Sequence, residues 1–186
     1  MLVLASGSPR RRELLQGLGL SFVLRPTHCD EYSDTSAPDA LVRELALRKA
    51  LACPLAAGET AVAADTVVCL DGEILGKPDS PECASDMLRA LSGRTHEVHT
   101  GVALRGGTGE THVFSECTRV TFRTLTEGMI ERYVASGEPF DKAGGYGIQG
   151  AAAVFVERIE GDYFNVMGLP VCALWRHLQE MGEVDA

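Results

Sequence analysis

The run AVAADTVVCL (61–70) constrains the fold most, because its apolar side chains would face both sides of a β-strand. A strand that is apolar on both sides lies inside a sheet that other elements cover on both faces. Asp65 interrupts this run, and an isolated buried carboxylate is costly unless it is paired, binds a metal or has a function. The run therefore predicts a central strand with a functional acid; the alternative is a hydrogen-bonded kink at the strand end.

The opening stretch LASGSPRRRELL (2–13) predicts a strand, a glycine turn and a helix in direct succession. Pro9 suits the first position of a helix, Ser8 the N-cap before it and Gly19 the position after its end. Arginines are unfavourable at a helix start, where backbone N–H groups already present positive charge, unless an anion binds there. The arginines at 10–12 therefore predict a phosphate site, with a solvated basic helix start as the alternative.

The chain as a whole is acidic, with a formal net charge of −9. A general nucleic-acid binder would instead have a broadly basic surface. An anionic ligand must therefore bind at a local basic site, and a divalent cation is expected to help neutralise it. We expect a small anionic ligand and no nucleic acid as partner.

The six cysteines include no C-x-x-C pair, and no apolar run approaches the roughly 20 residues of a membrane span. The arginines follow the first apolar residues, which is the wrong order for a signal peptide. These patterns predict free thiols, no membrane partner and a cytoplasmic location.

Strand and helix patterns alternate along the rest of the chain. Strands are predicted at 22–24, 73–75, 95–104, 111–124 and 152–159, and helices near 38–51, 81–92 and 126–136 and after Pro170. Glycine turns at 71–72 and 106–109 predict antiparallel hairpins. Because hairpins mix with helices, the fold class is α/β with a mixed sheet, in one domain (1–186) that could form two lobes around a cleft.

Three short motifs match known patterns only in part. GYGIQG (145–150) lacks the preceding strand and following helix of a dinucleotide site. GEILGKP (72–78) is one residue short of a phosphate loop and has proline in place of its Ser or Thr. HEVH (96–99) places its two histidines on opposite faces of a strand, so they cannot share one metal ion.

The glycine-rich segment EPFDKAGGYGIQG (138–150) predicts a loop that moves over a ligand. Lys142 in this loop and Lys77 in a rigid Gly-Lys-Pro loop are candidate cations for binding the substrate. The amide of Gln149 has the paired donor and acceptor groups that can read a base edge. With the phosphate site and the buried acid, these residues favour an enzyme that acts on a phosphorylated small molecule with a metal ion.

Six blocks in order resemble the Maf family: LASGSPRRRELL, AADTVV, GKPDS, LSGRTHEVHTGVAL, GEPFDKAGGYGIQG and FNVMGLP. The resemblance implies an elongated α/β molecule like the inosine triphosphatases, with a long twisted mixed sheet flanked by helices and a central cleft. It also implies a homodimeric nucleoside triphosphate pyrophosphatase that uses Mg²⁺ or Mn²⁺. Water would attack the α-phosphorus, and the products would be a nucleoside monophosphate and pyrophosphate.

The same resemblance implies a role for each matching residue. Asp65 is the expected proton acceptor, and a carboxylate base there would deprotonate the attacking water. Glu31 and Asp65 are the expected metal ligands. The triphosphate is expected to contact Ser8, Arg10, Arg11 and Lys77, and the base is expected to be selected by Arg10, Thr66 and Gln149.

Arg10 and the YGIQG loop resemble the dTTP/UTP branch of the family, which could also act on modified pyrimidine nucleotides. Another branch has tryptophan in place of Arg10 and favours 7-methylated GTP. The segment GAAAVFV (150–156) departs from the family, which often has a further glycine near position 152. The alternative function is a regulator of cell division and septum formation that binds a partner, which would not need Asp65 together with Lys77.

Overall fold

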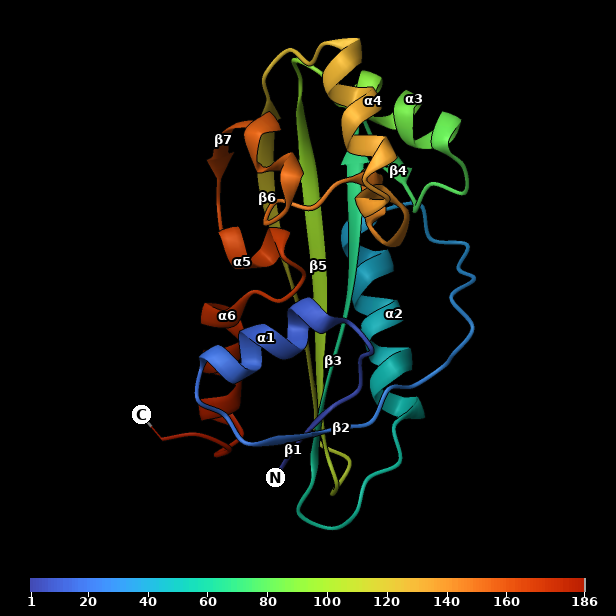
Figure 1. Ribbon diagram of the computed structural model, residues 1–186. Coiled ribbons are helices and arrows are strands. Elements are labelled where there is room, and N and C mark those ends of the chain that lie inside the picture. Colours follow the sequence, from blue (N-terminus) through green and yellow to red (C-terminus); the bar gives the residue numbers. More distant parts are fainter. Residues whose placement is uncertain (186) are drawn as a thin grey trace.

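A mixed sheet of seven strands forms the centre of the computed structural model, which describes residues 1–185 (Figure 1). The strand order is β2-β1-β3-β5-β6-β7, and β4 pairs with β3. The strands are β1 (Leu2–Leu4), β2 (Phe22–Leu24), β3 (Thr60–Leu70), β4 (Glu73–Leu75), β5 (Thr95–Gly106), β6 (Thr111–Phe122) and β7 (Val156–Glu160). β1 runs parallel to β2 and β3, and the other pairs are antiparallel, so the predicted mixed α/β sheet is confirmed.

The helices flank this sheet, and the long strands β3, β5 and β6 extend along an elongated molecule (Figure 1). The helices are α1 (Pro9–Gly17), α2 (Pro38–Ala52), α3 (Pro81–Leu91), α4 (Glu127–Ala135), α5 (Tyr163–Val166) and α6 (Val171–Glu180). Proline begins α1, α2 and α3, where its fixed φ angle suits the first helical turn. Ser8 occupies the N-cap position of α1, as predicted, although its side chain makes no capping hydrogen bond.

β3 is buried on both faces, as its sequence predicts. Ala61 and Ala63 face a small cluster that contains Ala46 and Ala50 of α2. The alternate residues, with Val62 among them, face the larger core of leucines and aromatic side chains. By the same alternation, Asp65 points toward α2, whereas Thr66 points toward the opposite face.

One edge of β3 is open in its middle. β1 pairs with residues 60–62 of β3, and β4 pairs with residues 68–70. Residues 63–67 have no strand partner on this edge within the part of the chain described. The gap between β1 and β4 leaves a notch in the sheet, and Asp65 and Thr66 lie in it.

The predicted strand at 152–159 is wrong in its first half. Residues Ala151–Phe155 form a 3₁₀ helix, and the strand β7 begins only at Val156. Ala152 and Phe155 are the buried residues of this segment, and their spacing of three matches the three residues per turn of a 3₁₀ helix. The short helix α5 was not expected from the sequence either. Among residues 1–185, no helix has the length and apolar character needed to cross a membrane.

Candidate active site

A cavity of about 730 Å³ opens at the notch in the sheet. Its wall includes all nine residues expected to bind substrate, base or metal: Ser8, Arg10, Arg11, Glu31, Asp65, Thr66, Lys77, Lys142 and Gln149. Arg12 lies instead at a smaller hollow beside Leu24 and Pro26. Residues from five separate parts of the chain therefore meet at one place.

Asp65 is paired with a lysine that the sequence analysis did not identify. Lys49 Nζ of α2 lies 2.5 Å from Asp65 Oδ1 and 2.7 Å from Glu31 Oε1. The side chains of Lys49 and Asp65 are 14% and 13% exposed, whereas that of Glu31 is 63% exposed. Lys49 thus joins a nearly buried carboxylate on the strand to a more exposed carboxylate on the loop before α2.

The two carboxylates control the protonation of Lys49. Burial lowers the pKa of the Lys49 ammonium, but Asp65 and Glu31 outweigh this effect and leave that pKa raised. The hydrogen bond from Lys49 is also the main reason why the pKa of Glu31 is lowered. Lys49 therefore carries its charge at neutral pH, and Glu31 is ionised beside it.

Gly101 allows α2 to approach the sheet closely enough for this contact. Gly101 lies opposite Asp65 in the β3–β5 register. A side-chain carbon at this glycine would collide with the backbone of Val42 and Arg43 in α2. Any larger residue at position 101 would push the helix away from the strand, and with it the ammonium of Lys49.

The sequence does contain a signal for Lys49. The buried residues of α2 are Val42, Leu45, Ala46 and Ala50. Lys49 follows Leu45 by four residues and therefore lies on the same buried face of the helix. A lysine on the buried face of a helix is as unusual as an aspartate within a buried strand, because both charges need a partner.

Arg11 fills the notch and is held mainly by the protein itself. Its Nη1 donates to the Ala64 carbonyl oxygen at 2.8 Å, which satisfies the strand edge that lacks a partner. Its other donors reach the Gly168 carbonyl oxygen, Ser6 Oγ and Thr66 Oγ1. Burial lowers the pKa of Arg11, and the charge of Asp65 opposes this shift. Four of the five N–H groups of a guanidinium are thereby used within the chain, which leaves one for a ligand.

Thr66 belongs to a directed chain of hydrogen bonds. Its Oγ1 accepts from Arg11 Nη2 at 3.0 Å and lies 2.9 Å from Thr100 Oγ1. The Thr100 hydroxyl donates to the Asn165 carbonyl oxygen, so the Thr66 hydroxyl donates to Thr100. Toward the cavity, Thr66 can therefore only accept a hydrogen bond.

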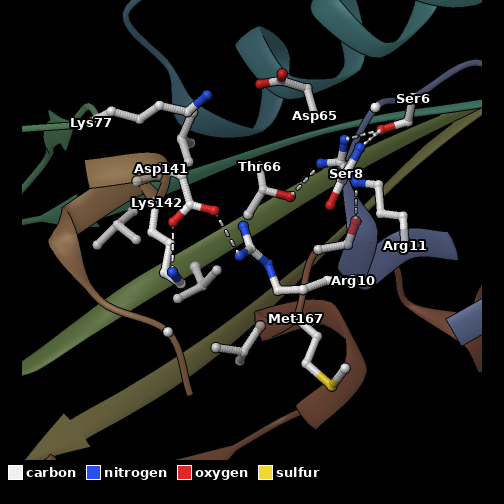
Figure 2. A pocket seen from close by; sticks show the side chains of 18 of the residues that line it. Ser6, Ser8, Arg10, Arg11, Asp65, Thr66, Lys77, Asp141, Lys142 and Met167 are labelled. Carbon is white, nitrogen blue, oxygen red and sulfur yellow. Dashed lines mark hydrogen bonds and ion pairs between the residues drawn. The ribbon is translucent and has the colours of Figure 1, made fainter. Parts of the chain in front are cut away.

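The glycine-rich segment forms the opposite wall, where Asp141 pairs with two of the predicted cations (Figure 2). Arg10 Nη1 lies 3.2 Å from Asp141 Oδ2, and Lys142 Nζ lies 2.5 Å from Asp141 Oδ1. The Asp141 side chain is 64% exposed. Because the carboxylate of Asp141 is exposed to solvent, its pairs with the two cations are screened, and an incoming phosphate can compete for both cations.

Two tyrosines anchor this segment to the core. Tyr133 of α4 accepts a hydrogen bond from the Gly147 N–H at 3.1 Å. The hydroxyl of Tyr146 lies 2.7 Å from His96 Nε2, and both side chains are buried beside Phe122. Burial lowers the pKa of His96 to about 4, so this histidine is neutral at physiological pH. One end of the segment is thus fixed while the exposed pairs at Asp141 face the cavity.

The oxygen atoms of Asp65 and Glu31 fit a hard divalent cation. Both carboxylates already approach a single positive charge, the ammonium of Lys49. Mg²⁺ is typically bound by one or two carboxylates together with water and substrate phosphates. Asp141, a third acidic residue of the cavity wall, pairs instead with Arg10 and Lys142.

Comparisons with known proteins show which chains this one resembles along most of its length. The family model described as "Maf-like protein" matches residues 1–181. A dTTP/UTP pyrophosphatase of Moorella thermoacetica is 57% identical over 178 residues, which cover 91% of this chain and 89% of the relative. A dTTP/UTP pyrophosphatase of a Geobacillus species is 49% identical over 183 residues, with 97% and 98% coverage.

A solved structure supports the fold alone. The HAM1 protein of Coxiella burnetii aligns with a TM-score of 0.54 at 18% identity, over 96% of this chain and 98% of that one. The overall fold described above therefore recurs in a distant protein. Because the family model spans nearly the whole chain and the two relatives are similar along most of their lengths, this chain belongs to the Maf family.

Proposed function

We propose that this protein is a nucleoside triphosphate pyrophosphatase that hydrolyses dTTP and UTP to the nucleoside monophosphate and pyrophosphate. The observation that carries the proposal is the meeting of a nearly buried strand carboxylate, Asp65, with Arg10, Arg11 and Lys77 in one cavity. The relatives from Moorella thermoacetica and Geobacillus, both named dTTP/UTP pyrophosphatase, support the choice of substrate.

Asp65 acts as the general base in this proposal. Lys49 holds Oδ1 of its carboxylate, and Oδ2 makes no hydrogen bond with residues 1–185. A water molecule at Oδ2 would lose its proton to the carboxylate as it attacks the α-phosphorus. A carboxylate that is positioned in this way typically contributes 10²- to 10⁴-fold to the rate. Lys49 is a positioning residue, because it fixes Asp65 without touching the reacting atoms.

The cations around the cavity bind the triphosphate. Arg10 and Lys142 exchange their contact with Asp141 for phosphate oxygens, while Lys77 is exposed at the cavity wall. Arg11 contributes a single donor and a fixed positive charge. Mg²⁺ or Mn²⁺, held by Asp65 and Glu31, would supply charge neutralisation for the phosphates and a lower pKa for bound water.

Thr66 and Gln149 are the proposed contacts for the base. Because Thr66 can only accept toward the cavity, it favours a base edge that carries an N–H donor. Uracil and thymine have such a donor at N3, whereas cytosine has an acceptor there. Gln149 is exposed at the same cavity and can supply both a donor and an acceptor to the neighbouring carbonyl groups of the base.

A panel of triphosphates tests this function. The purified protein is incubated with dTTP, UTP, CTP, ATP and GTP in Mg²⁺ or Mn²⁺, and the products are identified in ¹⁸O-labelled water. We expect hydrolysis mainly of dTTP and UTP, pyrophosphate as a product, and label in the nucleoside monophosphate. Orthophosphate with a nucleoside diphosphate, or label in pyrophosphate, would exclude attack at the α-phosphorus.

The homodimer and the cytoplasmic location are part of the same proposal and rest on the resemblance to the family. Sedimentation analysis of the full chain tests the dimer, and fractionation of cells tests the location. The alternative of a regulator that acts only by binding a partner gains no support from the comparisons. Such a regulator would not require Asp65 to be paired with Lys49 inside a cavity lined with cations.

A further inference from the structure

A second cluster of reactive side chains lies on the sheet outside the cavity. Glu97 and His99 are alternate residues of β5, and Cys117 of β6 lies directly opposite His99 in the register. All three side chains therefore project from the same face of the sheet. One ligand atom from each lies within 4.8 Å of the other two. None of the three residues lines the cavity of the candidate active site.

The spacing of these atoms matches that of zinc ligands. His99 Nε2 lies 3.6 Å from Cys117 Sγ and 3.2 Å from Glu97 Oε2. In a tetrahedral zinc site with ordinary bond lengths, the nitrogen and sulfur ligands are about 3.5 Å apart and the nitrogen and oxygen ligands about 3.3 Å apart. The side chains are thus already close to the separations that coordination requires.

Burial differs among the three residues in a way that suits a metal site. His99 is 8% exposed, so packing fixes its ring. Cys117 is exposed, and the Glu97 side chain is 48% exposed, so an ion can enter from solvent. His99 Nδ1 is buried without a hydrogen-bond partner among residues 1–185, which leaves Nε2 as the nitrogen that faces the other two ligands.

We propose that Glu97, His99 and Cys117 bind one thiophilic divalent cation of the Zn²⁺ class, with water in the fourth position. The combination of imidazole nitrogen, thiolate sulfur and carboxylate oxygen is the ligand chemistry that Zn²⁺ accepts and that Mg²⁺ does not. This site is independent of the proposed hydrolysis, whose carboxylates select a hard cation. His99 lies opposite Val67, two residues beyond Asp65 on the same face of the sheet.

Binding of the ion requires a proton to leave Cys117. Although Cys117 is an exposed residue, partial burial is the main cause that raises the pKa of its thiol; Glu97, Asp39 and Cys69 act in the same direction, whereas Arg119 opposes them. The neutral thiol therefore loses its proton to solvent as the metal–sulfur bond forms. Because metal binding releases this proton, affinity should rise with pH.

The unpartnered Nδ1 limits how tightly the ion is held. A histidine ligand usually donates its second N–H to an acceptor, and loss of that acceptor weakens metal binding by about 10- to 100-fold. His99 has no such acceptor among the residues described. We therefore expect reversible binding that tightens with pH, in contrast to the nearly permanent zinc of a structural finger.

Titration of the reduced full-length protein with Co²⁺ alone tests the site, because Co²⁺ bound to a thiolate has a charge-transfer absorption band in the near ultraviolet. We expect one Co²⁺ per chain with this band, and displacement by Zn²⁺. Cys117→Ser should abolish the band. Glu97→Gln should weaken Co²⁺ binding by more than about tenfold, but the protein that still binds Co²⁺ should show the band. Cys172→Ser, a change at another exposed cysteine, should leave both band and affinity unchanged.

The controls make the result decisive. His177→Gln alters the separate cluster of His112, His177 and Glu180, which contains no thiol, and should not affect the band. Circular dichroism confirms that each variant is folded. The proposal is overturned if wild-type protein gives no saturable band, or if the band survives in folded Cys117→Ser.

Discussion

The two faces of the sheet are packed differently, and Asp65 depends on the difference. The face toward α2 is lined by alanines and glycine, so the helix lies close to the strands. The opposite face is lined by leucines and aromatic residues, which form a thicker layer under α3, α4 and α6. The close packing of α2 places the ammonium of Lys49 beside Asp65. On the opposite face, the larger core holds the glycine-rich segment through the buried side chain of Tyr146.

The two faces of the sheet differ in how far their contacts can adjust. On the α2 side, small residues leave little room for adjustment, because interiors are packed about as densely as crystals. On the other side, the cavity wall contains the exposed carboxylate of Asp141, whose two ion pairs phosphate can replace. Asp65 is thus held in one position, whereas the cations that pair with Asp141 can exchange it for another anion. Substitutions on the two faces should therefore have different effects.

Gly101→Ala should have the largest effect, because it disrupts the packing of α2 against the sheet. The added methyl group would collide with the backbone of Val42, so α2 must move or the strand must bend. We expect unfolding free energy to fall by about 3 kcal/mol, and hydrolysis to fall as Lys49 leaves Asp65. Gly106→Ala on the same strand is the matched control, since its nearest neighbours would lie at 3.7 Å, an ordinary contact. Urea unfolding measures both, and equal losses would refute the packing argument.

Lys49→Gln should leave Asp65 nearly buried without its partner charge. We expect kcat/KM for the preferred triphosphate to fall by about 10- to 100-fold, with partial recovery in Lys49→Arg. Another arginine of α2 provides the control: Arg43 pairs with Asp39 at the surface, and Arg43→Gln should change activity by less than about threefold. Steady-state kinetics of the three variants decides whether Lys49 positions the acid.

Lowering the pH should lower the free energy of unfolding through His96, which lies in the larger core. An unfolded chain protonates this histidine at its ordinary pKa of 6.5, whereas burial lowers the pKa in the folded protein to about 4. Between these values the unfolded state binds the extra proton, so this contribution to stability is present above pH 6.5 and lost as pH falls toward 4. The slope should approach about 1.4 kcal/mol per pH unit.

Urea unfolding from pH 7 to 5 measures this slope. His96→Gln cannot take up the proton and should flatten the dependence, whereas His177→Gln, at a half-exposed position, should not. An unchanged slope in His96→Gln would assign the acid sensitivity to other groups.

Tyr146→Phe should have the smallest effect of the series. It removes the hydroxyl that lies 2.7 Å from His96 Nε2 but keeps the ring packed against Phe122. A lost buried hydrogen bond of this kind costs about 1 kcal/mol. Tyr32→Phe, at an exposed tyrosine, is the control and should be neutral. A loss well above 2 kcal/mol would indicate that the segment holds more of the core than its contacts suggest.

The sequence predicted those parts of the site whose signal is local. Asp65 stands out because its own strand neighbours are apolar, and Arg10 and Arg11 stand out because they begin a helix. Lys49 was missed because its unusual burial appears only when the helical face of α2 is considered, and its partner is on another element. Arg11 binds the open edge of β3, and this role depends on a notch that forms only when the sheet is assembled. Gly101 allows α2 to lie close to β5, and this role depends on a contact between two separate segments.

The second cluster illustrates the same limit. Glu97 and His99 are two residues apart, so the sequence alone places them on one face of a strand. Cys117 lies beside them only because of the register between β5 and β6. Cysteine spacing alone therefore gave no reason to expect a metal ligand. The segment at 151–155 was predicted as a strand because it is apolar, and its spacing of buried residues, three apart, decides for a 3₁₀ helix only once the core around it is known.

Asp65→Asn gives the most direct test of the central claim that a fixed carboxylate in the notch drives hydrolysis. The amide has nearly the same size but cannot accept the proton of the attacking water. We predict that kcat for dTTP or UTP falls by about 10²- to 10⁴-fold while nucleotide binding, measured separately by calorimetry, changes only a few-fold. A folded Asp65→Asn variant that turns over at close to the wild-type rate would contradict the account.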